Sequence, residues 1–247
     1  MLAAAKLIPL LNLAIAFAPV AIVVGILVRW SMKSGVALYA VARMVIQLLL
    51  IGFVLMWIFE TDQSVVPVPQ SALVIGVLSI MLGVASWIAL RPVAGKRRDF
   101  YWKALGAIVI GGGSTLLLVT QLVLQADPWF APAVMIPLAG MIFSNSMNTI
   151  SLGAERLTSE MKNGESYESA RQTALQAALI PITNSLLAVG LVSLPGMMTG
   201  QILSGVSPLI AVRYQIMVMC MAYGSGGIST AVFLTLVRPE SSAESAA

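Results

Sequence analysis

The chain has 247 residues, of which 59% are apolar and 10% are charged, and its formal net charge is +4. Soluble domains usually carry about a quarter charged residues, so this composition excludes an ordinary soluble domain. There is no His and a single Cys, Cys220, which excludes an internal disulfide framework and a metal site built from His.

Apolar runs recur from one end of the chain to the other, each close to the length of about 20 residues that crosses a bilayer as a helix. Inside lipid, only helices and closed barrels pair all of their backbone groups. The runs are continuous rather than alternating, which favours helices. We therefore predict an all-α, polytopic integral membrane protein with about seven transmembrane helices.

In chain order, the predicted helices cover roughly 8–28, 36–58, 70–90, 104–125, 132–152, 174–195 and 208–236. No small-residue cleavage signature follows the first run, so we interpret it as a retained span rather than a removed signal peptide. Pro and Gly residues interrupt 180–210, which leaves open one span plus a broken or re-entrant stretch. We expect a single permease domain over 1–247, with a disordered tail at 240–247.

Lys and Arg gather in alternate connections, near 29–35, 91–103 and 153–173. The positive-inside rule assigns these three segments to the cytoplasm. The N-terminus is then expected outside and the C-terminus in the cytoplasm, as an odd number of spans requires. Lys6 on the outer side runs mildly against this orientation.

The longest polar stretch runs from Gly153 to Gln176. Within it, Asn163 and Gly164 indicate a turn, and Ser166 is placed to cap a following helix. The pattern predicts a short cytoplasmic helix pair, which is either a docking element for a soluble partner or an ordinary solvated loop. The docking candidates are Glu155, Arg156, Glu168 and Arg171.

Amide and guanidinium side chains inside the predicted spans need polar partners or water, so they are candidates for a polar substrate path. In the fifth span, Asn145 and Asn148 favour a lining role, whereas Gly140 and Ser144 favour helix packing. An arginine near the outer end of the last span either points into the bundle or reaches outward to the interface. The substrate-path candidates are Gln47, Asn145, Asn148, Arg213 and Gln215.

Small residues four apart indicate close helix contact, which we expect at Gly196 and Gly200 as well as at Gly140; a dimer seam is the alternative. Methionines crowd the C-terminal half, and thioethers suit Cu(I), but Met is also an adaptable packing residue, so no metal ligand is assigned. The sequence has no GxxxxGK[ST] phosphate loop and no set of nucleophile, base and orienting group. We therefore predict that the chain is not an enzyme and binds no cofactor itself.

Three segments carry a family resemblance: MIPLAGMIFSNSMNTISL at 135–152, AALIPITNSLLAVGLVSLPGMMTGQILSG at 177–205, and AVRYQI at 211–216. With these segments, the chain resembles the membrane subunits of the iron-export ABC permease family. That family was long described as uncharacterised membrane proteins and includes plant aluminium-sensitivity and aluminium-tolerance permeases. The resemblance extends over nearly the whole chain.

The resemblance implies a homodimer in the bacterial inner membrane that works with a separate ATP-binding cassette subunit, which binds the ATP. It implies export of iron or a related metal ion, with membrane lipid but no nucleic acid as a further partner. An ABC permease for an organic solute such as a nucleotide sugar is the alternative. A carrier coupled to an ion gradient is a second, but such coupling usually requires a carboxylate within a span, and every Asp and Glu here lies in a predicted loop, span end or tail.

Overall fold

The computed structural model describes residues 9–60 and 69–238. Lys6 and the expected tail at 240–247 lie outside the described residues. The chain divides into two compact units, Met1–Val66 and Pro67–Ala247. The described part of both units is helical and contains no β-strand, which confirms the all-α class; the single permease domain stays a prediction.

Six helical segments of the described chain are long and apolar enough to cross a membrane. They are Leu10–Arg29, Ser34–Val54, Gln70–Ala89, Arg91–Val123, Pro132–Lys162 and Pro208–Leu236. Each overlaps a predicted span, and the polytopic membrane architecture is confirmed.

The first unit is a helical hairpin. Its first arm consists of α1 (Leu10–Ile15) and α2 (Ala18–Arg29), and its second arm is α3 (Ser34–Glu60), which packs against α2. The first arm is broken between α1 and α2 because Pro19, at the start of α2, lacks the N–H that a continuous helix would use. The described side chains of α1 and α2 are not buried, as expected for helices whose apolar faces meet lipid.

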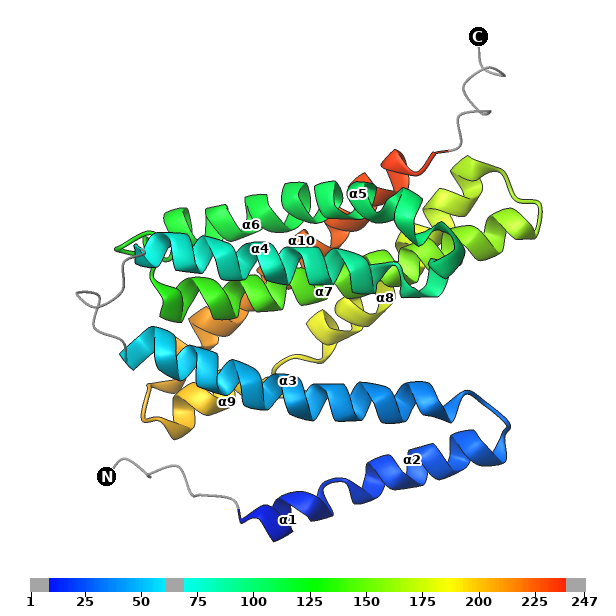
Figure 1. The fold of residues 1–247 in the computed structure, drawn as a ribbon. Coiled ribbons are helices and arrows are strands. Elements are labelled where there is room, and N and C mark those ends of the chain that lie inside the picture. The colour runs from blue at the N-terminus through cyan, green and yellow to red at the C-terminus, as the bar shows by residue number, and fades with distance from the viewer. Residues whose placement is uncertain (1–8, 61–68, 239–247) are drawn as a thin grey trace. The chain divides into compact units, whose positions relative to one another are not determined.

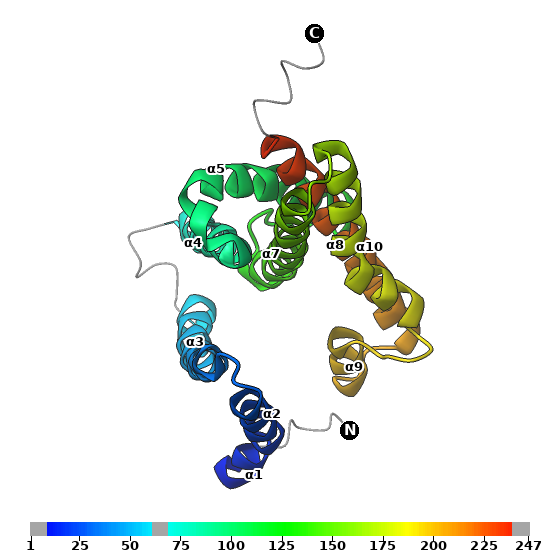
Figure 2. The ribbon, with the colours of Figure 1, turned by 90° about the vertical axis from the view of Figure 1, so that its right-hand side faces the viewer.

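The second unit is a bundle built around α7 (Figure 1). Its elements in chain order are α4 (Gln70–Ala89), η1 (Arg91–Lys96), α5 (Arg97–Ile108), η2 (Val109–Gly113), α6 (Ser114–Leu117), η3 (Leu118–Val123), α7 (Pro132–Lys162), α8 (Tyr167–Ala188), α9 (Gly196–Leu203) and α10 (Pro208–Leu236). Figure 2 shows α7 between α4 and α5 on one side and α8 and α10 on the other. The most deeply buried side chains are apolar ones such as Ile108, Ile142, Ile150 and Phe233.

The polar stretch after the fifth predicted span folds as its sequence predicts. The helix α7 continues past residue 152 to Lys162, and Gly164 takes a positive φ of 90° in the turn that follows. The hydroxyl of Ser166 then accepts a hydrogen bond from the Ser169 N–H and caps α8. The predicted turn and cap are therefore confirmed, whereas the two helices of the predicted short pair are the ends of the long helices α7 and α8.

The span predicted at 174–195 differs from the structure. The helix α8 starts seven residues earlier, at Tyr167, and ends at Ala188, and it is not among the six membrane-length apolar segments because its first turns are polar. After Val189 the chain turns sharply through Gly190, whose φ is 83°, and then forms the eight-residue α9. The broken stretch that the Pro and Gly residues left open is therefore present at 189–207.

Candidate functional site

Four segments of the second unit meet at one end of the bundle, which we call the basic end: η1, the last turns of α7, the first turn of α8 and the last turn of α10. Glu168 of α8 forms an ion pair with Arg238, which follows α10, at 3.4 Å. The hydroxyl of Tyr167 donates a hydrogen bond to the Leu234 carbonyl oxygen in α10. The segments 91–103 and 153–173 thus share one end, as their common assignment to the cytoplasm requires; the assignment itself stays a prediction.

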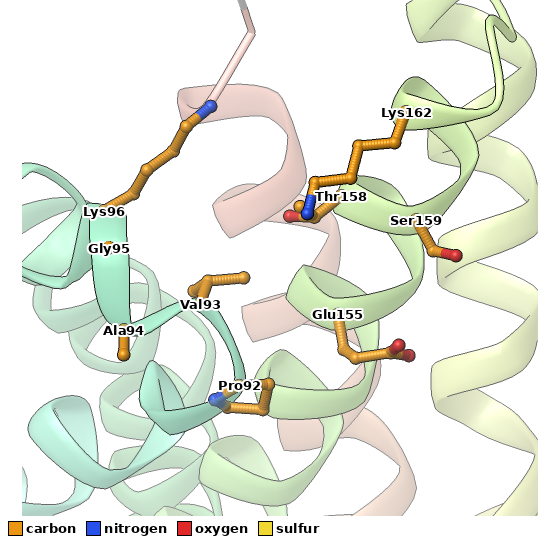
Figure 3. A pocket seen from close by; sticks show the side chains of 9 residues that line it. All are labelled: Pro92, Val93, Ala94, Gly95, Lys96, Glu155, Thr158, Ser159 and Lys162. Atoms are coloured by element: carbon orange, nitrogen blue, oxygen red, sulfur yellow. The ribbon is translucent and has the colours of Figure 1, made fainter.

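A groove of about 430 Å³ opens at the basic end between η1 and α7, and we call it the η1–α7 groove (Figure 3). Residues Pro92–Lys96 form one wall, and Glu155, Thr158, Ser159 and Lys162 form the other. Lys96 and Lys162 lie on opposite walls, and buried Val93 gives the groove an apolar floor. The groove thus combines two cations, the Glu155 carboxylate, the Ser159 hydroxyl and an apolar floor, a mixed lining that suits a protein segment with both charged and apolar side chains.

The four docking candidates are all at the basic end but do not converge on one point. Glu155 lines the η1–α7 groove, whereas the exposed Arg156 turns to Glu160, one turn further along α7, with 2.6 Å between the charged atoms. On α8, Glu168 is exposed and Arg171 is half-buried. Glu168 and Arg171 form what we call the charged rim of the basic end. The role of all four candidates in docking stays a prediction.

Sequence reasoning missed the groove itself. Lys96 and Lys162 fall in the two basic segments, so their side of the membrane was predicted, but their proximity depends on the tight turn of η1. Pro92 and the non-helical backbone of Val93 fold η1 back against the end of α7. A Pro-containing turn between two predicted spans is a signal for such a fold, but it does not identify the helix that η1 meets.

Tyr167 joins α8 to α10 at the basic end. Its ring is 5% exposed, and the guanidinium carbons of Arg171 and Arg238 lie 5.7 and 5.8 Å from the ring centroid. Burial raises the pKa of Tyr167 above its usual 10.0, and the two nearby positive charges oppose that rise. The phenol is therefore held in its neutral, hydrogen-bonding form.

Polar groups connect α7 to α10 in the middle of the bundle, in what we call the polar seam: the hydroxyls of Ser146, Thr149 and Ser229 and the backbone carbonyl of Ser225. Ser229 Oγ donates to Ser146 Oγ at 3.1 Å, and Ser146 Oγ donates to the Ser225 carbonyl oxygen at 3.3 Å. Thr149 Oγ1 lies 3.1 Å from the Gly226 carbonyl oxygen of α10 and 3.0 Å from the Asn145 carbonyl oxygen of its own helix, so one hydroxyl proton serves both acceptors. All four side chains are buried, so these polar groups are used for packing two helices together rather than for contact with a solute.

Glycines that sequence reasoning did not single out allow this close approach. A Cβ added to Gly111 in η2 would lie 2.5 Å from the Ser229 backbone nitrogen, so no larger residue fits there without movement. A Cβ on Gly153 in α7 would lie 2.9 Å from Thr230 Cγ2. Gly111 and Gly153 are constrained by atoms of α10. Residue spacing within a single helix does not show which helix packs against it, so the sequence alone could not identify these two glycines.

The glycines that were predicted to pack behave differently. A Cβ on Gly140 would meet only Met81 Cε, at an ordinary 3.4 Å, and no described atom lies within 4 Å of a Cβ built on Gly196 or Gly200. The close helix contact expected at Gly196 and Gly200 is therefore not made within the described chain. The alternative, a dimer seam at these positions, stays a prediction.

Two of the substrate-path candidates lie on α7. Asn145 is half-buried, and its Nδ2 donates to the Met141 carbonyl oxygen one turn back at 2.8 Å. Asn148 is exposed on the surface of the second unit, as is Ser144 one turn earlier. An amide on the surface of a membrane helix needs a polar partner, so this face of α7 favours a solute, water or a second protein surface over plain lipid.

The other path candidates lie on other helices, α10 and α3. Gln215 of α10 is 5% exposed, and its Oε1 has no hydrogen-bond partner among the described residues. Arg213 is exposed and lies beside an apolar crevice of the same unit. Gln47 is exposed on α3 of the first unit. Their assignment to one substrate path stays a prediction.

Comparison with known proteins decides the family. The model of the uncharacterised protein family UPF0014 matches residues 10–241, nearly the whole chain. The chain belongs to the UPF0014 family. No solved structure matches it.

Three UPF0014 relatives show how far the similarity extends. A UPF0014 membrane protein of Synechocystis sp. is 35% identical over 225 residues, covering 83% of each chain. The probable iron export permease protein FetB of Escherichia coli is 35% identical over 243 residues, covering 90% of this chain and 88% of the relative. The ALUMINUM SENSITIVE 3 protein of Arabidopsis thaliana is 32% identical over 242 residues, covering 91% of this chain and 85% of the relative.

These relatives confirm the resemblance that the segments at 135–152 and 177–205 predicted. Within the UPF0014 chain, the first segment lies in α7, and the second covers most of α8, the 189–195 turn and α9. The relatives include proteins described as membrane proteins and one described as a probable permease, in agreement with the membrane-length helices.

Proposed function

We propose that this UPF0014 protein is the membrane-spanning permease subunit of an ABC exporter that moves iron or a related metal ion. The observation that carries the proposal is the 35% identity, over 90% of the chain, to a probable iron export permease. The permease works as a homodimer in a bacterial inner membrane. A separate ATPase subunit binds the ATP, since the sequence has no phosphate-binding loop of its own.

The basic end is where the ATPase docks. The η1–α7 groove and the charged rim beside it provide a shaped surface, and the only other connection of α7, near Asp127, lies at the opposite end of the helix. Association of two ATP-loaded subunits pushes on the groove. The bundle then switches between an inward and an outward opening.

The helix α7 transmits this movement. It is 31 residues long, about 46 Å, and it carries both the groove wall and the path asparagines. Glu155 lies ten residues from Asn145, so the two are about 15 Å apart along the axis. The polar seam couples α7 to α10, so the two helices move together rather than sliding past each other.

Amide oxygens line the proposed metal path. Within the second unit, Asn145 and Asn148 offer oxygen ligands, which Fe²⁺ accepts, and Gln215 adds a buried carbonyl oxygen without a partner in the described chain; Gln47 is a separate candidate in the first unit. Neutral amides bind a divalent cation weakly. Weak binding suits an exporter because the ion must leave on the far side.

A permease for an organic solute such as a nucleotide sugar is the second candidate. It is favoured by one observation: the described residues hold no group of three His, Cys, Asp or Glu side chains that could bind a metal ion. A neutral or anionic organic solute needs no such group.

Reconstitution tests the two candidates together. The permease and its ATPase are placed in liposomes, and ATP hydrolysis and the movement of radiolabelled iron are measured against a panel of metals and nucleotide sugars. We expect Fe²⁺ to stimulate hydrolysis and iron to move only with ATP; liposomes with the permease alone are the control. Stimulation by a nucleotide sugar but not by iron would replace the metal assignment and leave the permease assignment intact.

A further inference from the structure

An apolar crevice of about 550 Å³ runs along the surface of the second unit, between α10 and the α6–η3 segment. Leu118 and Val123 line one wall, and Ile216, Gly224 and Ile228 line the other. The hydroxyls of Ser114 and Thr115 also reach this region, but both donate to backbone carbonyl oxygens one turn back in their own helix. The crevice therefore offers a ligand mainly hydrocarbon.

Arg213 stands at one end of this crevice and is its only charged lining residue. Within 9–60 and 69–238, Arg213 makes no ion pair and no hydrogen bond, whereas the ion pairs of that part of the chain use Arg156 and Arg238. It lies five residues after Pro208, the first residue of α10, which places it about 8 Å from the helix end. A guanidinium at that depth lies near the headgroup level of the bilayer, where it needs an anionic partner.

The dimensions of the crevice fit one lipid chain. From Arg213 to Ile228 the crevice follows fifteen residues of α10, about 22 Å. One leaflet of a bilayer contributes about half of the 30 Å hydrocarbon thickness, so an acyl chain starting at the headgroup level fits within this length. A planar guanidinium binds two oxygens of a phosphate at once.

We propose that this crevice is a binding site for a phospholipid with a net anionic headgroup, whose phosphate pairs with Arg213 and whose acyl chain lies along α10. The absence of a cationic group in such a headgroup favours it over a zwitterionic lipid, since a choline or ethanolamine would lie close to Arg213. The site is separate from the η1–α7 groove at the basic end. It does not depend on the transported substrate or on the ATPase.

Native mass spectrometry tests the site on the purified full-length chain. The protein in neutral detergent is given equal amounts of phosphatidylglycerol and phosphatidylcholine with identical acyl chains, and the retained lipid is measured. The wild type is expected to retain phosphatidylglycerol preferentially. Arg213→Gln should lower retention of phosphatidylglycerol by about tenfold or more, the effect of losing the charge-assisted hydrogen bonds to its phosphate, and should remove the preference over phosphatidylcholine because no cation remains to repel the choline; Arg213→Lys should keep part of both.

A second pair of variants tests the contribution of the apolar crevice to lipid binding separately from that of the Arg213 charge. Gly224→Leu fills the crevice and should reduce retention of both lipids, because a Cβ at Gly224 meets open space and the chain still folds. Gly106→Leu, at an equally open position of α5 outside the crevice, should leave retention unchanged. An unchanged lipid preference in Arg213→Gln would overturn the proposal. So would equal retention of both lipids by the wild type, or a dimer that Gly224→Leu disrupts without any change in retained lipid.

Discussion

At the scale of single residues, the tightest constraint is Gly111. A Cβ there would lie 2.5 Å from a backbone nitrogen of α10 and 2.9 Å from Ser229 Cα, and backbone atoms cannot rotate away as a flexible side chain can. Gly111→Ala should therefore lower the free energy of unfolding by about 1–3 kcal/mol, the usual cost of overpacking. Thermal unfolding in detergent measures this.

The neighbouring Gly113 provides the control, because a Cβ there meets no described atom within 4 Å. Alanine in a helix is favoured over glycine by about 1 kcal/mol, so Gly113→Ala should leave stability unchanged or raise it. If both alanine variants unfold at the wild-type temperature, α10 does not approach η2 as closely as described.

Tyr167 makes stability depend on pH at the alkaline end. Burial raises the folded-state pKa of Tyr167 above 10.0, so the neutral phenol is favoured in the folded chain. The corresponding stability is fully present below the unfolded-state pKa and is lost as pH rises through the folded-state pKa. The wild type should therefore lose more stability than Tyr167→Phe between neutral pH and pH values above about 10. Parallel pH curves for the two proteins would show that the phenol is not buried against α10.

At the scale of elements, some features followed from local pattern and others did not. The α7–α8 turn was predictable because Asn163, Gly164 and Ser166 are local signals, each of which acts within one turn of its own helix. The end of α8 at Ala188 was not predictable, since apolar residues such as Leu191 and Val192 continue beyond it. Val189 takes an extended backbone that ends the helix, and Gly190 takes a left-handed one in the turn that follows. A hydropathy value averaged over a window of residues does not detect a break in the helix at one position.

The candidate site divides in the same way. The docking residues were predictable as charges in a basic loop, but the η1–α7 groove requires two loops separated in sequence to meet. Asn145 and Asn148 of α7 were singled out for a path, whereas the neighbouring hydroxyls of Ser146 and Thr149 lie within hydrogen-bond distance of carbonyl oxygens of α10. Only the partner helix shows which polar groups are used for packing and which remain open to a solute.

Reversing single charges at the basic end tests whether it is the docking surface for the ATPase. Changing Glu155, Glu168 or Arg171 to the opposite charge should each weaken co-purification of the ATPase, because the rim beside the groove is expected to meet complementary charges. Glu168 and its ion-pair partner Arg238 are both about half exposed, so losing their pair costs at most about 1 kcal/mol and the chain still folds. Asp127→Lys, an equally exposed change at the far end of α7, should have no effect. Unchanged co-purification for all three reversals would place the docking surface elsewhere.

At the scale of the whole molecule, composition alone was sufficient to predict a helical membrane protein, since so few charges leave no soluble core. The arrangement of the bundle was not predictable, because continuous apolar helices carry little information about which face meets which neighbour. Small residues that allow close contact, such as Gly111 and Gly153, act only in pairs across helices. Charge placement remained informative, because the two basic segments 91–103 and 153–173 do meet at one end of the second unit.

The account depends most on the side of the membrane that the basic end occupies, because a cytosolic ATPase reaches only one side. Lys162→Cys and Asp127→Cys, each in a chain where Cys220 is replaced by Ser, can be labelled with a membrane-impermeant maleimide. In intact cells freed of their outer membrane, we expect labelling at position 127, and at position 162 only after the membrane is permeabilised. Labelling at position 162 from outside would place the η1–α7 groove out of reach of any cytosolic ATPase and would contradict the proposed exporter.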